Sequence, residues 1–561
     1  MENKRNTFVI SKALKGFVLA SVLTAAAGQL GGTLDVVVLA QFVGEEAVSA
    51  LSLVMPVTTL ISCTGLLMAF GANALAARAI GRHDRESAVV VFSTAIWSIL
   101  TIGVLFSLLM YASLPTIVRV FINEESLRAL PTEYLRIYVL GAWLEMLSYA
   151  LCLFVATDGH PRRVTAAVAM GVTANLLVDV LAVGFLDWGI QGVAWGTLSQ
   201  FAVNVLLLGC WIQTSSNSYR LTRPGRQSIK VFLQNIQEGA PVTISNVLMA
   251  FTVVTVNHIT YETQGDMGLF YWSVCLQVLL IAAVVVNGVM EALFAIGGVL
   301  VGEHDLSGFS ILTRRALLMV VLLTMSLVAL LWIPDAVGVV FGIEHPEKMA
   351  DMNHVMRSFS LLLPPFSLTL ILVAAYQVME RWTLSVVVVV GQLCVLVVAI
   401  WLFANNTPDD IWFGFPIGAT LFLGGQLLYT WLYSRSHGCR VSGLTLIPYS
   451  EGGHSLDYSV VCRENKAQEV LRQTAAFLRK WGVSDDSVSR LEPCLDTLMT
   501  NVVQHASRRP FDLHVYTSEG RAWVTLKSGG SPYNPVEAAM TEAGSISYKY
   551  MYGLNTILII L

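Results

Sequence analysis

Long apolar runs separated by short polar loops fill the first three quarters of the chain. A membrane-spanning helix needs about 17–25 mostly apolar residues, and twelve runs reach that length. They form two sets of six on either side of a basic linker, Tyr219–Lys230. The runs lie near 14–42, 46–72, 88–113, 134–156, 164–186 and 189–213, and then near 237–262, 267–300, 314–341, 355–379, 383–404 and 411–434. This pattern predicts an all-α polytopic membrane protein with about twelve helices in two six-helix lobes.

The pattern changes from about Tyr449 onward, where short strand-like and amphipathic segments replace the long runs. Alternating apolar residues indicate strands and hairpins, and a period of 3.6 indicates helices. The expected order is a strand, two helices and two hairpins, at 456–462, 464–482, 487–506, 511–530 and 545–561. We therefore expect a small C-terminal α/β sandwich domain. The predicted domains are 1–218, 219–440 and 445–561.

The composition agrees with a membrane part followed by a water-soluble tail. Hydrophobic residues make up 55% of the chain and charged residues only 13%, whereas about a quarter of a soluble globular chain is charged. Roughly a fifth of the positions after residue 440 are charged, against roughly a tenth before it. The eight cysteines are scattered without metal-site spacing, which favours a reducing compartment over a disulfide framework or zinc site. No nucleic-acid partner is expected.

Basic residues recur in every second loop, which orients the predicted bundle. The basic segments are the N-terminus, 78–85, 160–163, 219–230, 314–315 and 434–440. Because Lys and Arg favour cytoplasmic loops, we expect both termini in the cytoplasm and the protein in the cell (inner) membrane. The N-terminus also resembles a signal peptide, but its apolar run continues to Ala40 and other spans follow, so we expect it to be retained.

A short motif recurs in the two halves. Gly81-Arg-His-Asp84 follows the second predicted span, and Gly302-Glu-His-Asp305 follows the eighth, each just before the next span. The recurrence predicts a six-span repeat with both halves in the same orientation, which is one of the known transporter plans.

Four polar residues lie at one predicted depth in the first half. Asn175 and Asp179 are four residues apart and share a helix face, and Asp35 and Thr197 fall ~10–12 Å below the same membrane surface. A carboxylate at membrane depth is costly unless it is protonated, paired or bound to an ion. Carboxylate, amide and hydroxyl oxygens are ligands for small cations. We expect a coupling-ion site here; the alternative is that Asp179 braces a helix bend near the interface.

Other intramembrane polar residues are candidates for lining a substrate cleft. Tyr138 and Glu145 lie two turns apart on one predicted helix face, and Asn257, His258 and Glu291 lie in the second half. A lone histidine on an apolar helix is more often a packing residue, and this alternative stays open for His258. Glu238 precedes Gly239-Ala-Pro241 and is either interfacial or functional.

Several motifs in order resemble those of the multidrug and toxic compound extrusion (MATE) transporters. They are LDVVVLAQFVG, ALSLVMPVTTLI, GANALAARAIGRHDRESA and ANLLVDVLAVGFLDWGIQGVAWGT. The resemblance covers about residues 10–440 and implies two lobes around a central cleft, with export of small organic compounds driven by Na⁺ or H⁺. The family's cation ligands correspond to Asp35, Asn175, Asp179 and Thr197. With Na⁺ as the driving ion, Asp35 and Asp179 would bind the metal.

The C-terminal segment resembles the ATP-binding fold of anti-sigma-factor serine kinases, in the gyrase/Hsp90/histidine-kinase/MutL superfamily. Asn501-Val-Val-Gln-His505 is similar to the family's Asn box, and Gly529 and Gly530 match its first glycines. However, Thr497 stands where the acidic base is expected, and Ser528 where the adenine-binding Asp is expected. The Gly-rich lid segment is also missing. We expect a degenerate, catalytically inactive module in which ATP binding is doubtful.

Taken together, the sequence predicts a secondary transporter that lies in the lipid bilayer and is not an enzyme. It would export amphipathic organic compounds by antiport with Na⁺ or H⁺ and would require no cofactor. The tail would regulate the protein or bind a cytoplasmic protein partner, or be a vestigial fusion. Two other functions stay open: a flippase for a lipid-linked precursor, and a membrane sensor that signals through its C-terminal domain.

Overall fold

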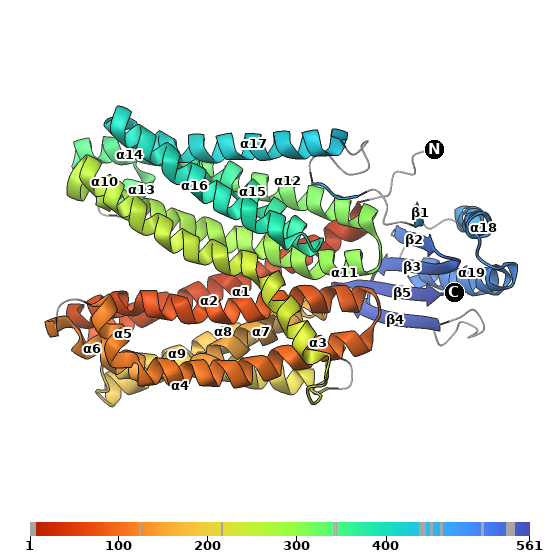
Figure 1. Ribbon diagram of the computed structural model, residues 1–561, viewed down its shortest axis with the longest axis horizontal. Helices are drawn as coiled ribbons and strands as arrows, with labels where there is room; N and C mark the ends of the chain where they lie inside the picture. The colour runs from red at the N-terminus through yellow and green to blue at the C-terminus, as the bar shows by residue number, and fades with distance from the viewer. Residues whose placement is uncertain are drawn as a thin grey trace.

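Two helical lobes and a small C-terminal α/β domain make up the protein (Figure 1). The computed structural model describes residues 7–122, 125–214, 217–341, 343, 345–436, 445–448, 453–460, 464–505, 510–534 and 545–561. The C-terminal domain lies at one end of the helical bundle, which we call the sheet end. The opposite end, where the lobes diverge, is called the open end.

The first lobe, the N-lobe, contains helices α1 to α9. Their bounds are α1 Phe8–Phe42, α2 Glu45–Gly81, α3 Arg85–Ser98, α4 Val104–Ala112, α5 Leu114–Phe121, α6 Ala129–Leu140, α7 Ala142–Thr157, α8 Pro161–Asp179 and α9 Ile190–Ile212. Short π-helical segments at Ile99–Gly103 and Val180–Phe185 continue α3 and α8. The predicted span 134–156 is two helices, α6 and α7, bent by 52° at Gly141.

The second lobe, the C-lobe, contains α10 to α17. Their bounds are α10 Ser228–Ala292, α11 Gly298–Gly302, α12 Leu306–Leu331, α13 Ala336–Val340, α14 Pro346–Ser360, α15 Leu363–Val378, α16 Trp382–Asn406 and α17 Gly414–Ser436. A π-helical segment, Leu293–Gly297, joins α10 to α11. Helix α10 contains a non-helical residue, Gly265 (φ 62°, ψ −149°), at the place where the sequence predicts a loop between two spans.

Ten of the described helical segments are long and apolar enough to cross a membrane, or eleven if the bent pair α6 and α7 counts as one span. One of the ten, Ser228–Gly302, is 75 residues long. A spanning helix needs about 20 residues, so this segment is several times longer than one crossing requires. The structure therefore confirms a multi-pass, mostly helical membrane protein, and the expected count of twelve spans stays a prediction.

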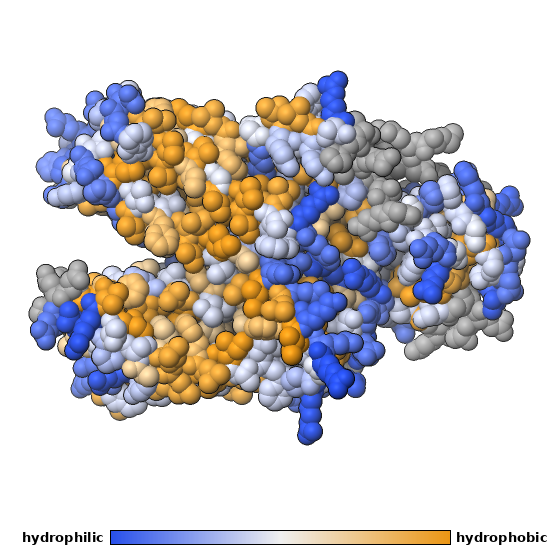
Figure 2. Space-filling model, in the orientation of Figure 1, coloured by the Kyte–Doolittle hydropathy of each residue, from blue (hydrophilic) through white to orange (hydrophobic). Residues whose placement is uncertain are grey.

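The lobes are in close contact near the sheet end and separate toward the open end. Figure 2 shows a deep notch between them at the open end, with apolar side chains over both lobes. Near the sheet end, a Cβ on Gly302 would lie 2.3 Å from the carbonyl oxygen of Arg78 and 2.9 Å from Cα of Gly81. Only glycine permits this approach of the two backbones. The buried Arg78 guanidinium also pairs with Glu238 of the C-lobe at 2.9 Å.

The two recurring motifs form matching loops at this contact. His83 and His304 both have positive φ, 54° and 59°. The carboxylates of Asp84 and Asp305 each accept a hydrogen bond from the backbone N–H three residues later and so cap the following helix. The shared geometry supports the predicted repeat.

The C-terminal domain is a five-stranded antiparallel sheet with two helices on one face. Its elements are β1 His454–Val460, α18 Glu464–Lys480, α19 Asp485–His505, β2 Phe511–Ser518, β3 Arg521–Gly529, β4 Ser545–Met551 and β5 Leu554–Ile560. The strand order is β1-β2-β3-β5-β4. Leu513 lies opposite Leu526, which lies opposite Ile557, and these residues pack with α18 and α19 in a separate core. The predicted strands and helices are confirmed, with ends shifted by a few residues.

Candidate functional site

The four predicted ion-site residues come from three neighbouring helices of the N-lobe. Asp35 lies on α1, Asn175 and Asp179 on α8, and Thr197 on α9. The Thr197 hydroxyl donates a hydrogen bond to Asp35 Oδ2 at 3.3 Å. Asp35, Asn175 and Asp179 are buried, with exposed fractions of 7%, 2% and 0%. The structure therefore brings the four residues into one buried cluster, which we call the N-lobe oxygen cluster.

Several oxygens of this cluster have no hydrogen-bond donor among the described residues. They are Asp35 Oδ1, Asn175 Oδ1 and both carboxylate oxygens of Asp179. A buried polar atom without a partner is costly, and a buried charge more so. A small cation bound by these oxygens, or protons on the carboxylates, would remove that cost. The donor set therefore fits Na⁺ or H⁺, with Asp35 and Asp179 supplying the negative charge.

A glycine that sequence reasoning missed allows the helices to close around Asp179. A Cβ on Gly196 would lie 1.8 Å from Asp179 Oδ1 and 2.9 Å from Asn175 Oδ1. Any larger residue would have to displace the carboxylate or α9. The sequence does show a small residue directly before Thr197. Its role as a close contact becomes clear only when the helix that faces α9 is known.

Two further features adjoin the cluster. The side-chain amide of Asn175 donates to Gln200 Oε1 of α9 at 3.3 Å. Asn175 Oδ1 takes no part in this hydrogen bond. The α-helical part of α8 ends at Asp179, and a π-helical segment follows. π-Helical turns inside helices occur often at functional sites. Gln200 was also missed, because the sequence does not show which α9 residues face α8.

Tyr138 and Glu145 meet, but inside the N-lobe core. The Tyr138 hydroxyl donates to Glu145 Oε2 at 2.6 Å, and Ser62 of α2 donates to the other oxygen. Both residues are buried, at 4% and 1% exposed. We expected the two residues on one face of a single helix. They lie instead on two helices and meet across the bend between α6 and α7. A substrate contact at this pair would require the core to open.

The C-lobe candidates do not form one site. Asn257 and His258 are exposed on α10, and His258 pairs with Glu262 four residues later at 3.3 Å. Glu291 is half-buried at the end of α10, before a π-helical segment. Glu238 is buried and belongs to the contact between the lobes described above.

The predicted nucleotide residues lie near the end of α19 and at the end of β3. Asn501 is half-buried, and its Nδ2 has no hydrogen-bond acceptor among the described residues. Gly529 ends β3, and Gly530 follows it. The side chain of His505 and the segment 535–544, where a lid would lie, are outside the described residues. Thr497 donates to the Pro493 carbonyl within α19.

A second cluster of charged residues lies between the C-terminal sheet and the C-lobe, and sequence reasoning missed it. Ligand atoms of Asp305, Asp457 and His514 lie within 4.8 Å of one another, close enough to hold a metal ion. However, the ammonium group of Lys527 lies 3.4 Å from Asp305 and 2.5 Å from Glu303. The Glu303 and Asp305 carboxylates are thus paired with the Lys527 ammonium group of the same chain.

Comparison with known proteins agrees with this architecture. Residues 20–181 match the family model MatE. The chain is 23% identical over 252 residues to the multidrug export protein MepA of Staphylococcus aureus, which covers 44% of this chain and 55% of MepA. It is 21% identical over 283 residues to MepA of Staphylococcus haemolyticus, covering 50% and 62%. The chain thus spans little more than half the length of the curated relatives it matches.

Solved structures match over a longer stretch. A crystal structure of MATE in complex with MaL6 has a TM-score of 0.70 and 19% identity, over 76% of this chain and 96% of that one. A multidrug resistance MATE family transporter of the MOP superfamily, solved in an outward-facing conformation, has a TM-score of 0.70 and 18% identity, over 79% and 100%. Members of this family are transporters rather than enzymes. The membrane part of this chain therefore has the MATE fold, and residues 20–181 are similar to the MatE family model.

Proposed function

We propose that this protein is a secondary transporter that exports small amphipathic organic compounds in exchange for Na⁺ or H⁺. The observation that carries the proposal is the N-lobe oxygen cluster, in which buried oxygens of Asp35, Asn175 and Asp179 have no donor among the described residues. A membrane protein tolerates such a group of oxygens when a cation or proton binds there during its cycle. The MATE fold and the similarity to multidrug export proteins support the same function.

The cluster gives a physical basis for coupling. Two carboxylates on different helices repel each other when both are charged, and a bound cation or proton cancels that repulsion. Asp35 is on α1, which also contacts α10 of the C-lobe. Ion binding at Asp35 and Asp179 would thus change how α1 packs between the lobes, and with it the shape of the notch. Asn175 and Thr197 act as neutral ligands.

We further propose that Ser228–Gly302 crosses the membrane twice, with its turn at Gly265, which brings the total to twelve spans. The sheet end would face the cytoplasm, because the basic loops of the sequence lie there. The notch at the open end would then face outward. The C-terminal domain would be a degenerate relative of ATP-binding kinase domains, since Thr497 and Ser528 replace its acidic residues.

The test is efflux from proteoliposomes under an imposed Na⁺ or H⁺ gradient, with a panel of fluorescent organic cations. We expect one gradient to drive efflux, and Asp179→Asn to abolish the gradient dependence. Asp187→Asn is the matched control, because Asp187 is exposed in the loop after α8 and has a positive φ of 54° that asparagine tolerates. Efflux in Asp179→Asn that follows the gradient as in the wild type would contradict the proposal.

A further inference from the structure

The C-terminal sheet has one apolar face and one polar face, and the polar face is covered by the membrane lobes. Residues of the apolar face pack against α18 and α19. The opposite face carries Asp512, His514, Thr525 and Lys527, which are 1%, 1%, 1% and 5% exposed. Burying charged and polar groups is costly unless they are paired. Lys527 and His514 have partners in the C-lobe, and Asp512 accepts a hydrogen bond from Ser459 of the same sheet.

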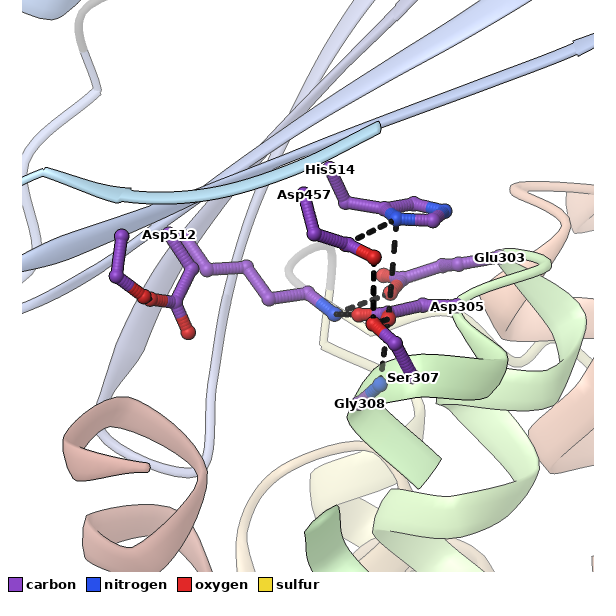
Figure 3. Close-up of polar contacts among 9 residues, drawn as sticks. Glu303, Asp305, Ser307, Gly308, Asp457, Asp512 and His514 are labelled. Carbon is purple, nitrogen blue, oxygen red and sulfur yellow. Dashed lines mark hydrogen bonds and ion pairs between the residues drawn. The ribbon is translucent and has the colours of Figure 1, made fainter. Parts of the chain in front are cut away.

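The first contact joins strands β1, β2 and β3 to the C-lobe (Figure 3). Lys527 of β3 pairs with Glu303 at 2.5 Å and Asp305 at 3.4 Å, in the loop before α12. Asp457 of β1 accepts a hydrogen bond from Ser307 at 2.7 Å. The His304 ring stacks on Tyr516 of β2, with centroids 4.6 Å apart.

The second contact joins the β4–β5 hairpin to the N-lobe. Lys549 of β4 pairs with the buried carboxylate of Asp158 at 2.8 Å and also donates to Ser218. Ser547 shares a hydrogen bond of 2.8 Å with His83. At the hairpin turn, Tyr552 donates to the Thr157 carbonyl at 2.6 Å.

The sheet therefore binds both copies of the repeated motif. The edge strand β4 contacts His83 in the N-lobe loop, and the inner strands β2 and β3 contact His304 and Asp305 in the matching C-lobe loop. These loops adjoin each other at the Gly81–Gly302 approach. A single hydrogen-bonded sheet thus spans the place where the two lobes would have to part for the sheet end to open.

The chemistry of the C-lobe contact favours docking that can be reversed there. Its charged and hydroxyl groups are well solvated once they separate, unlike the apolar surface of a permanent interface, whereas the N-lobe contact also buries Met551 and Leu554 of the hairpin in the core of the membrane lobes. The domain also has a core of its own between the sheet and its two helices. It could thus leave the lobes without exposing that core.

We propose that the C-terminal domain is a clamp between the lobes: it holds the sheet end shut while docked on both, and must release one lobe before that end can open. Alternating access moves the two halves of a transporter against each other. Hydrogen bonds fail when donor and acceptor separate beyond about 3.5 Å, so a rigid sheet cannot follow both lobes as they part. The effect on transport rests on the proposed function, whereas the clamp itself does not.

A clamp has a distinctive mutational signature. Lys527 holds the C-lobe and Lys549 holds the N-lobe, and both contacts are needed to resist separation. Lys527→Met alone, Lys549→Met alone and the double variant should therefore open the sheet end to the same extent. Two independent anchoring contacts would instead give effects that add. Lys480→Met, on the exposed end of α18, is the matched control.

Hydrogen exchange of the full-length protein in nanodiscs measures opening without requiring a substrate. We expect each single variant and the double variant to speed exchange in residues 78–85 and 298–306 by about tenfold, the effect of losing one charge-assisted hydrogen bond. Lys480→Met should exchange like the wild type. Efflux in proteoliposomes should also rise in the clamp variants.

Other results would overturn the clamp. Unchanged exchange at both loops in the double variant would show that the sheet does not restrain the lobes, and additive effects would show two separate anchors. Faster exchange throughout the core of β2 and β3 would indicate unfolding of the domain. In that case Asp158→Asn, which weakens the N-lobe contact from outside the domain, must speed exchange in the loops without speeding it in β2 and β3. If it does not, the clamp proposal is wrong. If no compound is exported but the loops open as expected, the transport proposal fails and the clamp stands.

Discussion

Gly196 of α9 lies so close to Asp179 of α8 that a Cβ at position 196 would be 1.8 Å from the carboxylate oxygen Oδ1. This approach places the Asp179 carboxylate, which is fully buried, against a helix backbone with no hydrogen-bond donor to it among the described residues. The carboxylate is therefore held in position by packing rather than by hydrogen bonds from the described residues.

Gly196→Ala should disturb the ion site specifically. The methyl group must displace Asp179 or α9, and overpacking of this kind costs about 1–3 kcal/mol of stability. We expect gradient-driven efflux to fall at least as much as in Asp179→Asn. Gly209→Ala is the control on the same helix, because a Cβ there would have nothing within 4 Å. Normal ion-driven efflux in Gly196→Ala would show that the close approach is unimportant.

The Glu145 hydrogen bonds should contribute to the stability of the N-lobe. Tyr138→Phe removes one hydrogen-bond donor from a buried carboxyl group, which costs about 1–3 kcal/mol. We expect thermal unfolding in detergent to occur at a lower temperature. Tyr111→Phe, at an exposed tyrosine, should leave the transition unchanged, and an unshifted Tm in Tyr138→Phe would contradict this role.

Docking of the β4–β5 hairpin should weaken in mildly acidic solution. Burial, together with the nearby ammonium groups of Lys549 and Lys527, lowers the pKa of His83 from 6.5 to about 4. The undocked state, with an ordinary His83 pKa, therefore binds more protons between pH 6.5 and 4, so docking is favoured above pH 6.5 and is lost progressively as the pH falls toward 4. Hydrogen exchange in β4 should be faster at pH 5.5 than at pH 7.5, after correction for the intrinsic pH dependence of exchange.

His83→Gln tests this assignment, because glutamine keeps a hydrogen-bonding group at position 83 but does not titrate. The corrected difference between the two pH values should disappear in this variant. A difference that persists would point to another group, such as Glu303, whose pKa is raised by burial and partly restored by Lys527.

The C-terminal domain should not respond to nucleotide. The resemblance to ATP-binding kinase domains predicts an acidic base and an adenine-binding Asp where Thr497 and Ser528 stand, so we expect the charge-assisted contact to adenine to be missing. We expect MgATP to leave the Tm of the full-length protein unchanged. A saturable rise in Tm would show that the domain binds nucleotide in spite of these replacements.

Much of this structure could be predicted from local sequence patterns. The spans and the strands appear as periodicities in neighbouring residues, and counting along the predicted helices placed Asp35 and Thr197 at one level, which agrees with the hydrogen bond between them. The break at Gly265 lies in the loop that the sequence predicts between two spans, whereas the bend at Gly141 was harder to place because its neighbours are apolar on both sides.

The remainder depends on which surfaces meet in three dimensions. Nothing near Gly196 in the sequence shows that it faces Asp179. Lys527 and Glu303 are 224 residues apart, and each looks like an ordinary solvent-exposed charge in its own segment. The polar face of the C-terminal sheet is buried by loops of the membrane lobes, so its role could not be inferred from the domain by itself.

The most direct test of the coupling site compares ion-driven efflux with equilibrium exchange of substrate in Asp35→Asn. Exchange requires the lobes to alternate but needs no ion gradient. We predict that Asp35→Asn abolishes gradient-driven efflux while labelled substrate still exchanges across the membrane, and that Asp187→Asn retains both activities. Gradient-driven efflux at the wild-type rate in Asp35→Asn would contradict the assignment of the N-lobe oxygen cluster as the ion site.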